Sequence, residues 1–138
     1  MNNDIRLTVT SRAGRQTAAS GSKWEPKMGY SRAVRSGNFI AVSGTVGASP
    51  DGKYPSSIAE QTRRSLSIIQ AAVESLGGKL EHIIRTRMFV TDVSKWEEVA
   101  GVHGEIFGEI RPATAIVEVT RLIDAEAKIE IEADAFVP

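Results

Sequence analysis

Histidine is the side chain best suited to proton transfer near neutral pH, and this sequence has two. His103 falls on the apolar face of a segment with helical spacing, where a lone histidine is more often a packed core residue than a catalytic one. His82 lies beside Glu81 among turn residues. The two histidines are far apart, with no carboxylates at ligand spacing around them, so the sequence predicts no metal site.

Several other sources of chemistry are missing from the pattern. The sequence has no cysteine, which excludes a thiol nucleophile, a disulfide framework and a thiolate zinc site. It has neither a glycine-rich phosphate loop nor a nucleophile elbow, and no cofactor is implied. Residues 128–135 alternate strictly between polar and apolar side chains, which predicts a strand over 128–137 with Glu130, Glu132 and Asp134, together with Phe136, on one face.

The elements that must position these residues can be placed from periodicity. Apolar residues at helical spacing predict helices over residues 58–76 and 96–107. Each helix follows a capping-box spacing and ends at glycine: Ser57 with Glu60 before Gly77-Gly78, and Ser94 with Glu97 before Gly108. Residues 83–90 are rich in β-branched and aromatic types and predict a strand between the two helices.

Strands also precede the first helix and follow the second. Residues 31–34 and 38–43 predict a hairpin whose second strand ends at Ser43-Gly44, and two strands finish the chain. The order ββαβαββ predicts an α+β fold with one mixed sheet and two helices on a single face, which leaves the other face to be covered. Residues 1–28 are expected to be an exposed lead-in with room for a first strand, and residues 29–138 a single domain.

Four short motifs give the sequence a family resemblance: Gly29-Tyr30-Ser31, Val42-Ser43-Gly44-Thr45, the run from Arg111 to Val119, and Lys128 to Ala133. Together they resemble the reactive-intermediate deaminase family, small proteins that hydrolyse enamines and imines released by pyridoxal-phosphate enzymes. The resemblance extends from about residue 29 to residue 137. It implies a chorismate-mutase-like fold that assembles as a homotrimer, with ligand clefts between neighbouring subunits.

The resemblance also implies which residues line the cleft. Tyr30 and Ser43-Gly44 fall where relatives contact the ligand, and Gly44 would let a ligand approach the backbone closely because it has no Cβ. Alternatively, Ser43-Gly44 only ends a strand. Glu130 matches the glutamate that relatives use to position the hydrolytic water, and His103 would lie nearby. The structural alternative is that Glu130 pairs across the sheet with Arg85 or Arg87.

One position departs from the family pattern. Deaminating relatives read Pro-Ala-Arg, with the arginine holding the substrate carboxylate, whereas this chain reads Pro112-Ala113-Thr114. A neutral hydroxyl in place of a bidentate guanidinium would cost about 3 kcal/mol, a weakening of a hundredfold or more for imines derived from amino acids. Arg111 is offset by three residues, which along a strand points to the opposite face unless Pro112 bends the chain.

Three functions therefore stay open. The first is a trimer that binds a small carbonyl, imine or enamine metabolite and hydrolyses it, with Thr114 contacting the group that replaces the carboxylate. The second is a non-catalytic trimer that senses a ligand or binds a protein. The third, a ribonuclease or translation inhibitor, has only the basic N-terminal segment to support it.

Charge and hydropathy limit the partners. The net charge is zero, although residues 1–35 hold seven Lys or Arg against Asp4 and Glu25. These cations are spread singly, with little aromatic interleaving, which favours a solvated arm over a nucleic-acid surface. No apolar run approaches the roughly 20 residues of a membrane helix, and the first twenty residues lack a signal-peptide core. We expect a cytoplasmic protein with no membrane partner.

Overall fold

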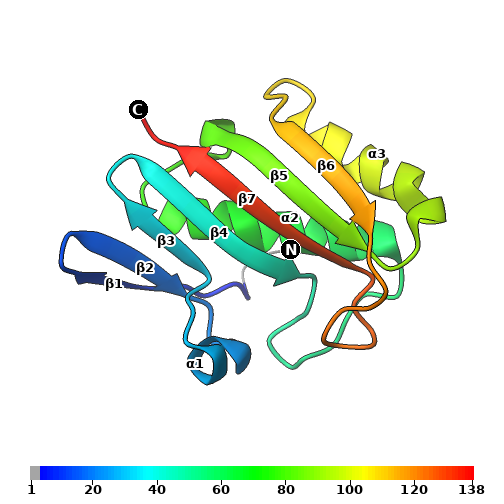
Figure 1. The fold of residues 1–138 in the computed structure, drawn as a ribbon, viewed down its shortest axis with the longest axis horizontal. Coiled ribbons are helices and arrows are strands. Elements are labelled where there is room, and N and C mark those ends of the chain that lie inside the picture. The colour runs from blue at the N-terminus through cyan, green and yellow to red at the C-terminus, as the bar shows by residue number, and fades with distance from the viewer. Residues whose placement is uncertain (1–3) are drawn as a thin grey trace.

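The computed structural model describes residues 4–138 and builds them into one sheet with helices packed on one face (Figure 1). The seven strands lie in the order β1-β2-β3-β4-β7-β5-β6, and of these pairs only β5 and β6 are parallel. Their bounds are β1 Thr8–Arg12, β2 Arg15–Ala19, β3 Ala33–Ser36, β4 Phe39–Val46, β5 Ile83–Val90, β6 Ala113–Glu118 and β7 Ile129–Phe136. The α+β class and the mixed sheet expected from the sequence are confirmed.

The helices occupy the positions that periodicity predicts. α2 (Ile58–Ser75) packs on β4 and β7, and α3 (Trp96–Phe107) packs beside it. The remaining helical pieces are α1 (Trp24–Met28), η1 (Leu80–His82) and η2 (Val93–Lys95). No helix in residues 4–138 is both long and apolar enough to span a bilayer.

The two helix starts differ from each other. Ser57 caps α2 as expected, because its hydroxyl accepts the backbone N–H of Glu60 at 3.1 Å. The second predicted cap, Ser94, is wrong. There Asp92 accepts the backbone N–H of Ser94 and starts η2, so that α3 begins at Trp96 without a side-chain cap. The carboxylate of Asp92 is a charged acceptor for the N–H of Ser94, so the helical turn starts two residues earlier than predicted.

The N-terminal segment, expected to be an exposed lead-in with room for a first strand, contains two strands. β1 is exposed along its length, but β2 joins the sheet through β3 and buries Ala18 completely. The turn between them is Ala13-Gly14, with positive φ at both residues (51° and 80°), the geometry of a two-residue hairpin turn. The sequence pattern did not indicate this hairpin, because most of its side chains are small or polar and alanine rarely adopts a positive φ.

β4 is longer than predicted and contains a bulge. Val42 pairs with Ala133 and Thr45 with Ile131, so three residues of β4 span two of β7. The extra residue lies at Ser43-Gly44, which is therefore inside the strand and not at its end. A bulge bends the strand and redirects side chains, and here it lies beside Glu130 of β7.

Candidate functional site

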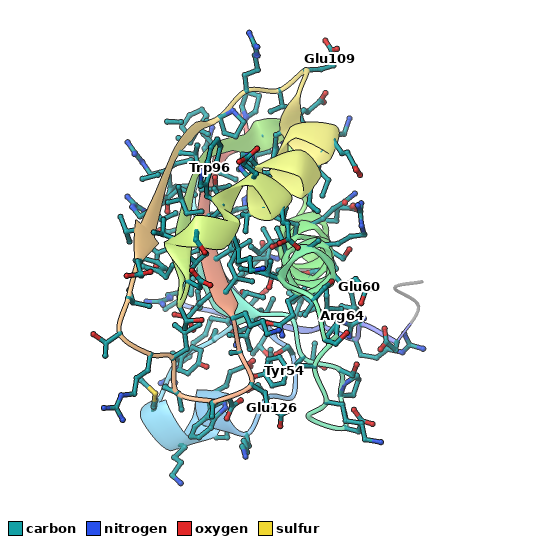
Figure 2. All side chains as sticks on the ribbon, turned by 90° about the vertical axis from the view of Figure 1, so that its right-hand side faces the viewer. Tyr54, Glu60, Arg64, Trp96, Glu109 and Glu126 are labelled. Carbon is teal, nitrogen blue, oxygen red and sulfur yellow. The ribbon has the colours of Figure 1, made fainter. Side chains whose placement is uncertain are left out.

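A hollow of about 590 Å³ lies between the start of β7, the bulge in β4, the loop before α2 and the N-terminal segment. Three of the predicted site residues line it: Tyr30, Gly44 and Glu130. Residues from the loops around Tyr54 and Glu126 complete the wall, and Figure 2 shows these two side chains at the end of the molecule opposite Glu109. The hollow is thus assembled from segments far apart in the sequence.

Gly44 and Glu130 are in direct contact within this hollow. A Cβ added to Gly44 would lie 2.8 Å from Cδ and 2.9 Å from Oε2 of Glu130, closer than real Cβ atoms approach. Glycine at position 44 leaves room for the Glu130 carboxylate against the backbone, and a larger residue would have to displace that carboxylate. Gly44 was expected to let a ligand approach the backbone closely. In this structure the Glu130 carboxylate makes that approach.

Glu130 is half-buried, and that burial raises the pKa of its carboxyl, an effect that the Arg32 cation opposes and the Glu132 charge reinforces. The cross-sheet alternative, Glu130 paired with Arg85 or Arg87, is not formed within residues 4–138, and Arg85 lies opposite Asp134 in the strand register. Arg87 reaches Glu132 at 3.3 Å and Asp134 at 3.2 Å, the other two acids of this face. Glu130 is left to face the hollow, where a carboxylate of raised pKa can exchange protons with water.

Tyr30 is held by a cation that the sequence analysis did not single out. Arg32 donates from Nη2 to the Tyr30 hydroxyl at 3.4 Å, and its guanidinium carbon lies 5.5 Å from the ring centroid. Arg32 is buried and also lines the hollow. Arg32 falls within the strand predicted over residues 31–34, but sequence alone does not tell a buried arginine from a surface one.

Tyr54 is a second unpredicted residue of the hollow. Its hydroxyl donates to Oδ2 of Asp124 at 2.6 Å, joining the loop before α2 to the loop before β7. Burial raises the pKa of Tyr54, and the nearby carboxylates of Asp124, Glu126 and Glu130 add to the effect, so the phenol stays protonated. Nothing in the local sequence marked the pair, because its members are 70 residues apart.

His103 and Thr114 lie together, but away from the hollow. Thr86 on β5 is fully buried, and its hydroxyl is 2.9 Å from Nε2 of His103 and 2.6 Å from Oγ1 of Thr114. The ring of His103 packs on Phe107 with centroids 4.6 Å apart, and burial lowers its pKa, which favours the neutral form. This cluster is on the helix-covered face, whereas Arg87 and Glu130 face the other side of the sheet.

The last two predicted residues have separate positions. Ser43 donates its hydroxyl to the Ser31 carbonyl at 2.7 Å, which fixes the chain beside Tyr30. Arg111 is exposed and precedes β6, with a left-handed φ of 57° and its N–H bonded to the Phe107 carbonyl. The strand-offset argument therefore does not apply to Arg111. Neither residue lines the hollow.

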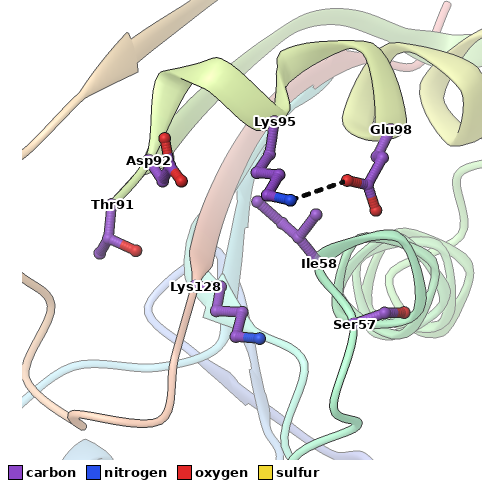
Figure 3. Close-up of a pocket in the computed structure, with 7 residues that line it drawn as sticks. All are labelled: Ser57, Ile58, Thr91, Asp92, Lys95, Glu98 and Lys128. Carbon is purple, nitrogen blue, oxygen red and sulfur yellow. Dashed lines mark ion pairs between the residues drawn. The ribbon is translucent and has the colours of Figure 1, made fainter.

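A smaller hollow of about 320 Å³ lies between the start of α2 and η2 (Figure 3). Its two lysines already have partners: Lys95 is 3.8 Å from Glu98, and Lys128 donates to the Ser56 carbonyl at 2.5 Å. It contains none of the predicted site residues. Across residues 4–138, no group of three or more histidine or carboxylate side chains is placed to hold a metal ion.

The contact at Gly44 gives a direct prediction. Gly44→Ala should fold normally, because the displaced atoms belong to the end of a flexible side chain, but it should push the Glu130 carboxylate out of place. We expect a loss of at least tenfold in any turnover that depends on Glu130, with a melting temperature close to that of the wild type. Gly101→Ala is the matched control, since a Cβ there meets nothing within 4 Å. Equal activities in the two variants would contradict the prediction.

Comparison with known proteins places this geometry in a family. Residues 21–137 match the family described as Endoribonuclease L-PSP. The chain is 38% identical over 110 residues to 2-iminobutanoate/2-iminopropanoate deaminase of Escherichia coli K12, covering 77% of this chain and 85% of that enzyme. Family members thus include imine deaminases, alongside the endoribonuclease description.

Solved structures agree with the sequence match. A Mycobacterium tuberculosis protein described as a member of the YjgF/YER057c/UK114 family superposes with a TM-score of 0.84 at 47% identity, covering 89% of this chain and 99% of that one. TdcF of Escherichia coli, solved with bound serine, gives 0.74 at 30% identity over 79% of this chain and 88% of its own. This chain therefore belongs to the YjgF/YER057c/UK114 family of reactive-intermediate deaminases that its motifs resemble.

Proposed function

We propose that this protein is a homotrimer of the chorismate-mutase-like fold that hydrolyses a small imine or enamine metabolite to a carbonyl compound and ammonia. The observation that carries the proposal is the Glu130 carboxylate, which lies against Gly44 in a hollow lined also by Tyr30. Its raised pKa suits a group that takes a proton from water and returns one to a leaving amine.

The chemistry needs only proton transfers and a positioned water. Water attacks the carbon of a protonated imine, Glu130 accepts a proton from that water, and the tetrahedral carbinolamine forms. Return of that proton from Glu130 to nitrogen makes ammonia the leaving group, and as it leaves the carbinolamine hydroxyl gives its proton back to Glu130 and the carbonyl forms. Tyr30 and Gly44 shape the pocket around these steps, while Ser43 holds the strand beside Tyr30. No cofactor enters the scheme.

The trimer brings the two groups of site residues together. Thr114 is exposed on β6, the edge strand, so it can face the hollow of a neighbouring subunit. There the Thr114 hydroxyl contacts the substrate group that replaces a carboxylate. Thr86 links His103 to Thr114, and Arg111 lies at the rim of the cleft. Support for assembly comes from large apolar side chains left exposed on the uncovered sheet face: Phe39 at 42%, Val117 at 47% and Phe136 at 48%.

Assembly is tested by mass. Light scattering at micromolar concentration should give about three times 14.9 kDa, because a sheet face with exposed aromatic side chains favours burial against another copy. A monomeric mass throughout that range would remove the intersubunit cleft and separate Thr114 from Glu130.

The non-catalytic alternative rests on Thr114 itself. The hydroxyl at the position of the family arginine is already bonded to Thr86, so the chain retains the scaffold without the usual carboxylate partner. Such a trimer would bind a small ligand and leave it unchanged. The endoribonuclease description of the family finds less support here, since the basic residues of the N-terminal segment are dispersed and Arg32 among them is buried.

A further inference from the structure

Arg32 is a buried cation that bonds to Gly44, the residue against which the proposed catalytic carboxylate lies. The exposed fraction of its side chain is 7%, and that of Glu25, its partner at 3.4 Å, is 6%. Glu25 is held in turn by Ser20, whose N–H donates to Oε1 at 3.0 Å and whose hydroxyl donates to Oε2. A buried ion pair of this kind is costly to desolvate and needs further hydrogen bonds to persist.

Those further bonds run to the bulge in β4. Arg32 Nη1 donates to the Gly44 carbonyl at 2.6 Å and to Oγ1 of Thr45 at 3.1 Å. Gly44 is the residue against which the Glu130 carboxylate lies. The same peptide is therefore bonded to Arg32 through its oxygen and packed against Glu130 at its Cα.

We propose that Arg32, with Glu25 as its counterion, is a positioning residue that fixes the Gly44 bulge and sets the charge environment of Glu130. The inference rests on the proposed role of Glu130. It makes the N-terminal segment part of the site, because Ser20 directly follows β2 and Glu25 lies in the first turn of α1.

The same contacts exclude a different role for Arg32. Its two terminal nitrogens already serve Gly44, Thr45, Glu25 and Tyr30, so it does not present the free fork that binds a carboxylate bidentately. Arg32 therefore does not replace the arginine missing at Thr114. The site is expected to accept imines that lack a carboxylate.

The charged groups around Glu130 define the test. Arg32 lowers the pKa of Glu130 by charge attraction, and Glu132 raises it. The remaining titratable or charged residues lining the hollow are Asp4, Arg6, Lys23, Tyr30, Asp51, Tyr54, Arg64, Asp124 and Glu126. Removing the positive charge at position 32 should raise the Glu130 pKa, and removing the negative charge at position 25 should lower it.

The experiment follows the Glu130 carboxyl carbon by ¹³C NMR titration of the full chain, assigned with Glu130→Gln. We expect Arg32→Gln to move the titration to higher pH and Glu25→Gln to move it to lower pH. Arg32→Lys, which keeps the charge but not the fork, should titrate close to the wild type while losing at least tenfold in turnover. A role confined to packing would not give shifts of opposite sign.

Arg35→Gln is the matched control, since Arg35 also donates to two backbone carbonyls, those of Gly37 and Leu76, outside the hollow. It should leave the Glu130 titration unchanged. Unchanged titrations in folded Arg32→Gln or Glu25→Gln, or an equal shift in Arg35→Gln, would overturn the proposal. If Arg32→Gln does not fold, the downward shift in Glu25→Gln decides the question alone. The titration needs no turnover, so opposite shifts in an inactive protein would sustain the role of Arg32 and count against hydrolysis.

Discussion

Glu130→Gln should lower the hydrolysis of a carboxylate-free imine by a hundredfold or more. The amide keeps the size and one acceptor of the side chain but cannot take a proton from water, and general acid–base catalysis is commonly responsible for about 10² to 10⁴ in rate. A suitable probe is the imine that an amine oxidase releases from propylamine. Initial rates of ammonia release with and without the protein measure the effect.

The pH dependence follows from the same group. Burial raises the pKa of Glu130, and the base form is the one that accepts a proton from water. Activity should therefore be lost as the pH falls through that raised pKa, at a higher pH than an ordinary glutamate would give. The residual activity of Glu130→Gln should not show this loss at low pH. Glu132→Gln is the comparison variant: it should keep the loss of activity at low pH but move it to lower pH, because the Glu132 charge raises the pKa of Glu130. A full rate in Glu130→Gln would show that another group activates the water.

The sequence predicted the elements that carry strong periodicity. Residues 83–90 coincide with β5, and the final strand lies within one residue of β7 at each end. The first was predicted from its β-branched and aromatic residues and the second from period-two alternation. The hairpin of β1 and β2 was missed because it is exposed and its turn uses Ala13 where glycine or asparagine is usual. Local sequence pattern predicts strands that bury one face in the core, and it misses exposed strands at the edge of the sheet.

Long-range contacts explain what the sequence left out of the site. Tyr30, Gly44 and Glu130 were found through motifs, and the structure places all three in one hollow. Arg32 was not found, because its importance comes from a bond to a backbone carbonyl 12 residues away. The bulge at Gly44 could not be read either, since it depends on the register between β4 and β7.

Thr114→Arg should convert the protein toward imines derived from amino acids. The wild type should hydrolyse 2-iminobutanoate barely above the uncatalysed rate, because a neutral hydroxyl already bonded to Thr86 offers no charged partner for the carboxylate. Position 114 is exposed on the edge strand, so a longer side chain can extend from it without entering the core. A bidentate pair is expected to be stronger by about 3 kcal/mol, which corresponds to about a hundredfold in rate.

The matched variant is Thr114→Lys, which adds the same charge as a point and not as a planar fork, and should gain less. Adding Glu130→Gln to Thr114→Arg should abolish the gain, because the anchored substrate would then lack its proton acceptor. A wild type as fast as arginine-bearing relatives would refute the argument from Thr114 and point to Arg111 as the anchor. A folded, trimeric Thr114→Arg without any gain would favour the non-catalytic trimer. Thr86 retains His103 as a hydrogen-bond partner in either variant, so loss of its bond to Thr114 does not leave a buried hydroxyl unsatisfied. An inactive variant therefore reports on the substrate site and not on a disrupted core.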